Sequence, residues 1–198
     1  MRRTLILSAF VLAISGPLAL AQDSDARRVV QTLGEQTVAA TKIEDKDARR
    51  RSLLEAATPA VDFKTIGAGV LAHAGVKVPG GREAEVMEGV IAFVSNQVIN
   101  EIDRIRPEEA KLGESKPKSE DEIRVPMLLA GVRDKIDADW VVKKTAEGWR
   151  VTDVMVSGNS LTAHFGGTLA RRSRGELEQL IEFLRAEQQR VRTAALQQ

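Results

Sequence analysis

The side chains best suited to chemistry near neutral pH are the only two histidines, His73 and His164, because imidazole has an ordinary pKa close to that pH. His164 follows Asp153 along the chain, and the two would together form an acid/base pair. The sequence contains no cysteine, zinc signature, phosphate-binding glycine loop or nucleophile elbow to complete such a site. We therefore expect a non-enzymatic protein without metal or cofactor. A small hydrolase or isomerase that uses Asp153 and His164 is the catalytic alternative.

Two arginine clusters are the other candidate binding residues. The three arginines at 49–51 lie in an expected helix, and we interpret them as a solvated face. Arg171, Arg172 and Arg174 follow the expected strands, where they could contact a phosphate headgroup or an acidic partner. His73 falls at the end of an expected helix, and its imidazole there would interact favourably with the last carbonyls.

Composition excludes several classes of protein. Of 198 residues, 29 are Lys or Arg and 28 are Asp or Glu, and the resulting net charge of +1 is too small for a general nucleic-acid binder. Aromatic residues make up 4% of the chain and tyrosine is absent, which argues against stacking surfaces for bases or sugars. The length and the hydrophobic fraction of 43% are typical of one globular domain with a real core.

Residues 1–21 have the pattern of a cleaved signal peptide. Two arginines near the start precede an apolar stretch at 5–14, which a Ser-Gly-Pro sequence at 15–17 interrupts. A small-x-small motif ends at Ala21, and the apolar stretch is shorter than the roughly 20 residues of a membrane-spanning helix. We therefore expect export to the periplasm, cleavage after Ala21 and a single mature domain at 22–198.

The hydrophobic period changes halfway along this domain. Apolar residues at helical spacing predict helices at 25–41, 47–57, from Asp62 to about 74, at 82–105 and at 175–193. Residues 107–120 are polar and are expected to form a surface connection. Runs rich in β-branched residues predict strands at 123–130, 135–144 and 149–157, and the last two are close enough for an antiparallel hairpin. Helices, then strands, then a closing helix predict an α+β domain with helices on one face of a curved antiparallel sheet.

Two local features leave alternatives open. Pro126 cannot donate a backbone hydrogen bond, so its strand should be an edge strand or a bulged one. Gly67 and Gly69 lie within the third expected helix, where they either weaken it or allow another element to approach its backbone closely.

The stretch from Gly148 to Leu161, GWRVTDVMVSGNSL, resembles the signature of the MlaC, or toluene-tolerance, family of periplasmic phospholipid-binding proteins. In that family an aromatic and a β-branched residue precede Asp-Val, and Gly-x-Ser-Leu follows. The strand that ends at 140–142, the helix start at 61–63 and the long helix from about 82 also fall where the family has such elements. The resemblance covers about 25–195 and is strongest at 136–161.

Two positions depart from the family pattern. Asn159 stands where the family usually has an aliphatic residue. Phe165 is followed by Gly166, whereas the family typically has an arginine after its aromatic residue. Both departures bear on the headgroup contacts that the resemblance implies, and hence on which lipid would be bound.

The resemblance implies a carrier that holds the acyl chains of a phospholipid in an apolar cavity between sheet and helices. Exposing about 30 methylenes to water at about 0.8 kcal/mol each costs on the order of 20 kcal/mol, so lipid passage between membranes needs such a cavity. The implied partners are an inner-membrane MCE-domain ABC transporter complex and an outer-membrane lipoprotein complex. A hopanoid-related cargo, or a periplasmic adaptor protein with a solid core, are the alternatives.

On that hypothesis the lining comes from both halves of the domain. The helices would contribute Ile66, Val70, Val90, Phe93 and Val94, and the strands Met127, Trp140, Val142, Val151, Val154 and Val156. Leu161 and Phe165 would close one end of the cavity. The three arginines at 171, 172 and 174 would contact the headgroup or a partner.

Overall fold

A computed structural model describes the backbone of residues 16–196 and the side chains of residues 23–189. The expected signal peptide therefore lies mostly outside the described residues. The elements follow in the order α1 (Gly16–Thr41), α2 (Lys46–Ala57), α3 (Phe63–Ala74), α4 (Glu83–Ile105), β1 (Glu109–Leu112), β2 (Lys116–Pro117), β3 (Glu122–Ala130), β4 (Lys135–Thr145), β5 (Gly148–Val156), β6 (Asn159–Ser160), α5 (Leu161–Ser173) and α6 (Leu177–Leu196).

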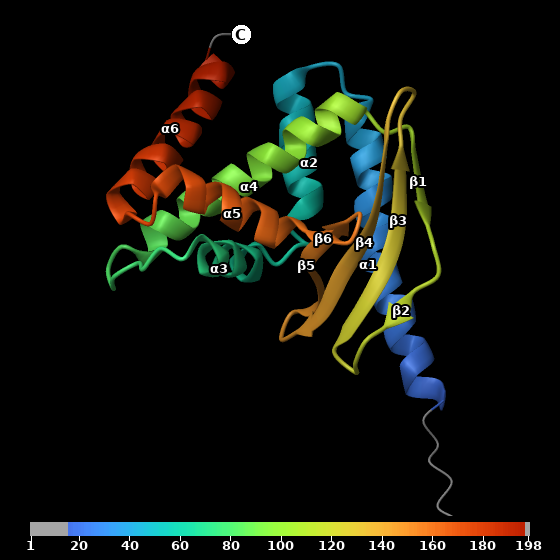
Figure 1. The fold of residues 1–198 in the computed structure, drawn as a ribbon. Helices are drawn as coiled ribbons and strands as arrows, with labels where there is room; N and C mark the ends of the chain where they lie inside the picture. Colours follow the sequence, from blue (N-terminus) through green and yellow to red (C-terminus); the bar gives the residue numbers. More distant parts are fainter. Residues whose placement is uncertain (1–15, 197–198) are drawn as a thin grey trace, which may run out of the picture.

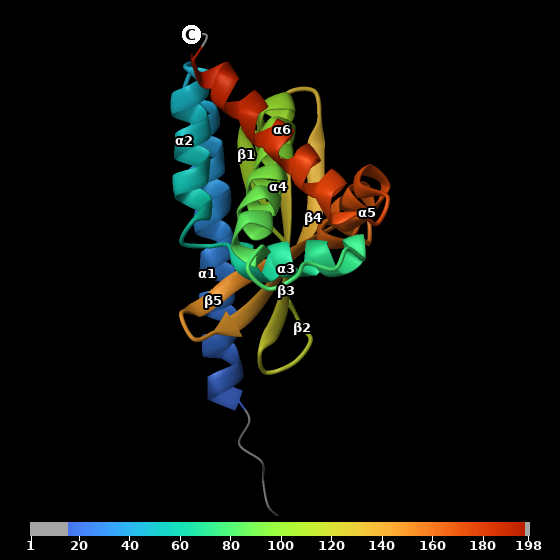
Figure 2. The same ribbon diagram turned by 90° about the vertical axis from the view of Figure 1, so that its left-hand side faces the viewer.

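The strands form one open, curved antiparallel sheet in the order β1-β3-β4-β5-β6, with β2 also paired to β3. The helices gather on one side of this sheet, and α3, α4, α5 and α6 extend away from it (Figures 1 and 2). The predicted α+β architecture is confirmed, including the β4–β5 hairpin.

The connection expected at 107–120 contains the short strands β1 and β2, which together flank β3. Pro126 lies opposite the gap between them, where its carbonyl accepts from the backbone N–H of Gly113 at 2.8 Å. Both backbone groups of a residue in an antiparallel strand point to the same neighbour, so the missing N–H of Pro126 faces this gap. The prediction of an edge strand is wrong, because β3 has partners on both sides and the flanking strand is interrupted instead.

Residues 161–173 form helix α5, in a stretch where the sequence predicted no helix or strand. Ser160 is its N-cap, since the hydroxyl oxygen accepts from the backbone N–H of Ala163 at 3.0 Å. Two consecutive glycines, Gly166 and Gly167, lower the helix propensity of this segment, so propensity alone does not predict the helix. The close packing against α3, described next, compensates for their low propensity.

Glycines allow α3, α4 and α5 to pack closely. A Cβ at Gly166 would lie 2.3 Å from the Cβ of His73 and 2.7 Å from the carbonyl oxygen of Val70. A Cβ at Gly69 would lie 2.6 Å from a methyl of Thr162, and one at Gly67 would lie 2.5 Å from the sulfur of Met87. Of the two roles open to Gly67 and Gly69, close approach is therefore the one observed.

The buried apolar residues form two clusters. The sheet core lies between the sheet and helices α1, α2 and the C-terminal half of α4, and comprises Ala26, Val30, Leu33, Ala40, Leu53, Ala56, Ala60, Ile99, Ile102, Ile123, Val125, Met127, Leu129, Val142, Trp149 and Val151. The helical core lies among α3, α4, α5 and α6, and comprises Val70, Ala74, Val76, Val86, Val90, Phe93, Val94, Phe165, Leu169, Leu180, Ile181 and Leu184. Helix α4 contributes to both.

Strand β5 joins the two regions. Val151 pairs with Val61 in a bridge just before α3, and its carbonyl accepts from the backbone N–H of Asp62 at 2.9 Å. The other end of β5 leads through β6 into α5. Both α3 and α5 therefore begin at this strand.

Candidate functional site

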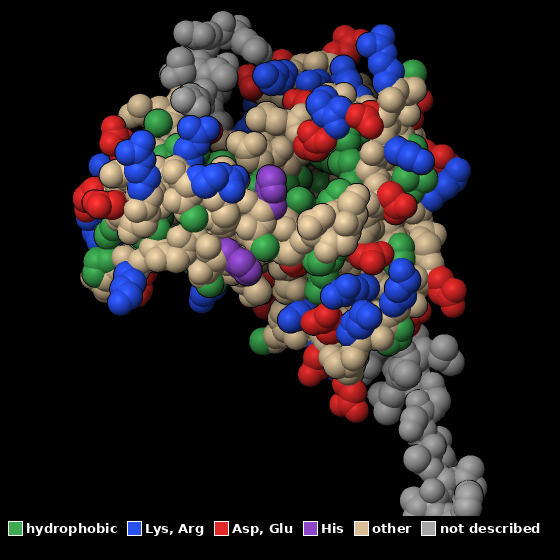
Figure 3. All heavy atoms as spheres, viewed as in Figure 1, with side chains coloured by type: hydrophobic (Ala, Val, Ile, Leu, Met, Phe, Trp, Pro, Cys, Tyr) green, Lys and Arg blue, Asp and Glu red, His purple; other side chains and the backbone are tan. Residues whose placement is uncertain are grey.

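An apolar cavity of about 110 Å³ lies between the helices and the inner face of the sheet. Its wall is formed by Leu33 and Thr37 of α1, Leu53, Leu54 and Ala57 of α2, Val61 and Phe63, Ile66 of α3, Val94, Ser95, Val98, Ile99 and Ile102 of α4, Leu129 of β3, Trp140 of β4, and Val151 and Val154 of β5. The space-filling view shows a hollow with hydrophobic side chains between the helical part and the sheet (Figure 3).

The strand register places the cavity-lining residues of the strands on one face of the sheet. Trp140 pairs with Val125 on one side and with Val154 on the other, and Val142 pairs with Val151. Val151 and Val154 are three positions apart and would face opposite sides of a regular strand. An irregularity in the pairing beside Val141 and Val142 turns both toward the helices.

The cavity wall carries no charged side chain, and its only side-chain polar groups are those of Thr37, Ser95 and Trp140. Such a surface is suited to hold hydrocarbon. The volume is well below the roughly 300–1,000 Å³ of typical ligand sites. A ligand larger than this volume would have to widen the cavity.

Helix α4 forms the rim of the cavity. Val98 is 38% exposed, and it is one of two large hydrophobic residues exposed among those the structure describes. Leu54, Phe63 and Ile66 are half-buried, and Leu54 and Ile66 pack against the sheet core and the helical core respectively. An apolar rim that reaches solvent is what entry of an apolar ligand requires.

The structure brings five of the expected lining residues together in this cavity: Ile66, Val94, Trp140, Val151 and Val154. Met127 and Val142 lie on the same face of the sheet but are fully buried in the sheet core, and Val156 is half-buried at the end of β5. The remaining five, Val70, Val90, Phe93, Leu161 and Phe165, belong to or pack against the helical core.

Sequence reasoning missed the contributions of α1, α2 and the C-terminal half of α4. Leu33 and Leu53 lie within the expected helices at 25–41 and 47–57, but the sequence of one helix does not indicate which face of the sheet it covers. Ile99 and Ile102 are part of the wide apolar face of α4, which had suggested burial against more than one neighbour. The width of this apolar face was the feature of the sequence that indicated a second contact surface on α4.

The arginines at 49–51 are not simply a solvated face. Arg49 is only 7% exposed, and its Nε donates to Oδ1 of Asp103 at 2.7 Å. Its Nη1 also donates to the carbonyls of Ile43 and Glu44 at 2.7 and 2.9 Å. These contacts connect α2 to α4, beside the cavity, so the interpretation of Arg49 as solvated is wrong.

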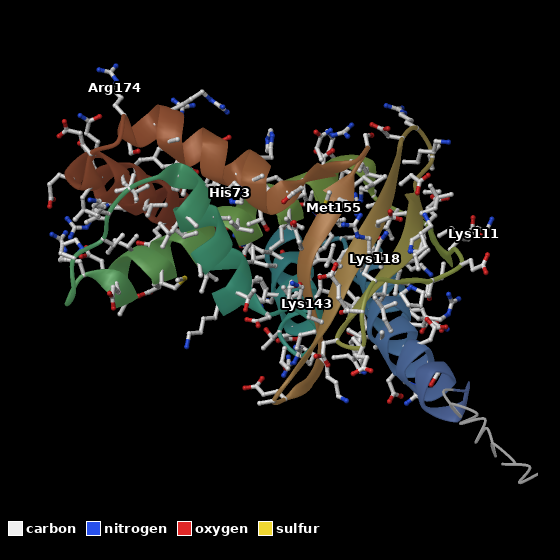
Figure 4. All side chains as sticks on the ribbon, turned by 60° about the horizontal axis from the view of Figure 1, so that its bottom comes forward. His73, Lys111, Lys118, Lys143, Met155 and Arg174 are labelled. Carbon is white, nitrogen blue, oxygen red and sulfur yellow. The ribbon has the colours of Figure 1, made fainter. Side chains whose placement is uncertain are left out.

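Arg171, Arg172 and Arg174 lie at the end of α5 that points away from the sheet (Figure 4). Arg172 contacts the ring of Phe183, with its guanidinium carbon 5.7 Å from the ring centre. It also lines a second hollow of about 390 Å³ between α4, α5 and α6, together with Phe93, Gln97, His164, Phe165, Thr168, Phe183 and Glu187. None of the three arginines lines the apolar cavity.

Asp153 and His164 do not form an acid/base pair. Oδ1 of Asp153 accepts from the backbone N–H and the hydroxyl of Thr162 at 3.1 and 2.8 Å, and Oδ2 accepts from the hydroxyl of Ser160 at 2.5 Å. The carboxylate thus fastens the start of α5 to β5, which accounts physically for the Asp and Ser of the sequence motif. His164 is exposed and packs edge-on beside Phe165.

His73 has the local role expected of it, since its Nδ1 lies 2.9 Å from the carbonyl oxygen of Gly69 within α3. Among the described residues no three His, Asp or Glu side chains gather where they could hold a metal ion. The described helices also include none that is both long and apolar enough to cross a membrane.

Comparisons with known proteins identify a family and a similar fold. The family model described as MlaC protein matches residues 26–186. The fold is similar to that of a phospholipid-binding protein from Ralstonia solanacearum whose structure was solved in complex with a phospholipid. The TM-score is 0.65 at 19% sequence identity, covering 82% of this chain and 96% of the other. A comparison with curated protein sequences finds no match.

Proposed function

The chain belongs to the MlaC family, and on that premise we propose that it is a periplasmic carrier of one phospholipid, whose acyl chains occupy the cavity between helices and sheet. The observation that carries this proposal is the cavity wall, where not one of the lining side chains is charged. An adaptor protein with a solid core does not require an apolar cavity, and an enzyme would require reactive side chains in the cavity wall.

The cavity, of about 110 Å³, must widen to admit acyl chains. Its walls come from separate elements, so α2 and α4 can move away from the sheet without breaking a strand ladder. The Arg49–Asp103 ion pair connects these two helices, and we expect them to move together. Burial of methylenes, each contributing about 0.8 kcal/mol, would offset the cost of opening.

The proposed setting is the periplasm, with residues 1–21 as a cleaved signal peptide and 22–198 as the mature domain. Cleavage after Ala21 would remove only the first turns of α1, ahead of Ala26, the first buried residue of the sheet core. The proposed partners are an inner-membrane MCE-domain ABC transporter complex and an outer-membrane lipoprotein complex. The arginines at the far end of α5 are better placed for such a partner than for a headgroup at the cavity rim.

Mass spectrometry of an organic extract tests the binding function. The mature protein would be purified from a periplasmic fraction without detergent, and its uptake of lipid from vesicles measured alongside. We expect one phospholipid per chain. A hopanoid would keep the carrier mechanism and change the cargo, whereas an empty protein that takes up no lipid would contradict the proposal.

Charged substitutions test whether the lipid binds in this cavity. Val98→Asp places a carboxylate at the rim of the cavity, where the side chain is already partly solvated, so the fold should persist while uptake is lost. Val132→Asp is the matched control, because Val132 is 79% exposed in the β3–β4 turn and lines no part of the cavity. Val94→Asp places the charge at a more buried position of the cavity wall and should also abolish retention of the lipid. Normal uptake by a folded Val98→Asp variant would refute this location.

A further inference from the structure

Trp140 has an indole N–H that the protein does not satisfy. Its Nε1 is buried and has no hydrogen-bond partner among the described residues. Buried tryptophan normally places this group against an acceptor, and leaving a buried donor without one is destabilising. An unsatisfied donor in a cavity wall is therefore a feature that calls for an explanation.

The surroundings of Trp140 supply no acceptor on the sheet. Val125 and Val154 lie directly opposite it on the neighbouring strands, and both are apolar. Across the cavity the only side-chain oxygens in the wall are the hydroxyls of Thr37 and Ser95. Thr37, Ser95 and Trp140 are thus the only residues of the cavity wall with a polar side-chain group.

A purely hydrocarbon ligand would leave this N–H buried and unsatisfied. An ester-linked glycerolipid differs, because two carbonyl oxygens lie between its polar headgroup and its acyl chains. Each of these can accept a hydrogen bond, and a hydroxyl such as that of Ser95 or Thr37 can donate a further one.

We propose that Trp140 is a specificity-determining residue, whose indole N–H donates to an ester carbonyl of a bound diacyl glycerolipid. The inference rests on the proposed function and makes it more specific. It places the ester region of the lipid at the middle of the sheet, inside the cavity, and restricts the preferred cargo to lipids with an acceptor at that depth. Ether-linked lipids and polycyclic hydrocarbons lack the carbonyl.

A competition experiment measures the preference. Vesicles would contain equal amounts of dioleoylphosphatidylcholine and its di-O-oleyl ether analogue, and the lipids taken up would be quantified by mass spectrometry. We expect the wild type to favour the ester lipid about fivefold, the range that one net hydrogen bond provides. Trp140→Phe should take up lipid with the preference reduced to about one.

Trp149→Phe is the matched control, since Trp149 is the only other tryptophan and lies outside the cavity wall. It should keep the ester preference. In this variant Trp140 is also the sole source of tryptophan emission, which should move to longer wavelength with the ester lipid and not with the ether lipid. This readout does not require Trp140→Phe to fold.

The outcomes separate the two proposals. Uptake of both lipids in equal amounts by the wild type, or an unchanged preference in a folded Trp140→Phe variant, would overturn the role of Trp140 and leave the carrier function standing. Uptake of neither lipid would count against the carrier function itself.

Discussion

The helical core and the sheet core are built by opposite means. In the helical core, Phe93 packs edge-on against Phe165 and Phe183, with ring centres 5.8 and 5.6 Å apart, and glycines bring α3 and α5 into contact. In the sheet core, side chains of four helices stop short of the inner face and leave the apolar cavity. The uncharged apolar cavity thus lies beside the sheet, whereas the hollow of about 390 Å³ between α4, α5 and α6 has charged and polar residues in its wall.

Helix α4 belongs to both regions, and its two ends differ accordingly. Its N-terminal half buries Val86, Val90 and Phe93 almost completely among other helices. Its C-terminal half presents Ser95 and Val98 to the cavity and its rim. The helical core can hold α4 at one end while the other end moves, which suits a cavity that must widen.

Truncating one leucine of the helical core and one leucine beside the cavity should give the largest difference in unfolding free energy. Leu180 is fully buried in the helical core, so Leu180→Ala should cost about 3–4 kcal/mol of unfolding free energy. Leu54 is half-buried beside the existing cavity, so Leu54→Ala should cost only about 1–2 kcal/mol. Urea denaturation of both variants measures the contrast, and equal losses would mean that the two cores are equally well packed.

Adding one methyl group tests how tightly the helical core is packed. Gly166→Ala would place a Cβ 2.3 Å from His73 and force α3 and α5 apart, at a cost of about 2–3 kcal/mol. Gly167→Ala is the matched control, because the nearest atom to its Cβ would be Nη1 of Arg171 at 3.6 Å. The control should gain up to about 1 kcal/mol from helix propensity. A neutral Gly166→Ala would show that α3 and α5 tolerate separation.

The sequence predicted five of the helices and the three long strands, and it missed α5 and the short strands β1, β2 and β6. Regular alternation around Trp140 identified β4, and the capping role of Asp62 located the start of α3. Helix α5 was missed because its glycines have low propensity, and only contact with α3, remote in sequence, shows why they are there. Only five of the 17 cavity-wall residues were among the expected lining residues, for the same reason: periodicity shows that Leu53 is buried, but which element covers it depends on tertiary packing.

Filling the cavity should separate ligand uptake from stability. Ala57 lines the cavity from α2, and Ala57→Leu would place its larger side chain in that space. We expect phospholipid uptake to fall about tenfold, a difference of about 1.4 kcal/mol, while the unfolding free energy stays equal or rises slightly. Glu55→Leu adds the same side chain at an exposed position of the same helix and should leave uptake unchanged. A large loss of stability in Ala57→Leu would instead indicate a rigid wall.

The smallest expected effect lies at the junction of the two regions, where Asp62 caps α3. Partial burial opposes ionisation of this carboxyl, but hydrogen bonds from the side chain and backbone of Thr65 and from the backbone of Lys64, with Arg150 nearby, hold its pKa below the ordinary value. The carboxylate therefore binds protons less readily in the folded state than in the unfolded state. Its contribution is fully present above the ordinary aspartate pKa and is lost as the pH falls through the lowered one.

We expect Asp62→Ala to cost about 1 kcal/mol at pH 7, the usual value of an N-cap. The difference between the wild type and the variant should shrink as the pH falls below the ordinary aspartate pKa, because protonation removes the same charge that the substitution removes. Urea denaturation of both proteins at pH 7 and pH 3 measures this difference, and effects common to both proteins cancel. A difference that is the same at both pH values would mean that Asp62 stabilises the junction by packing rather than by charge.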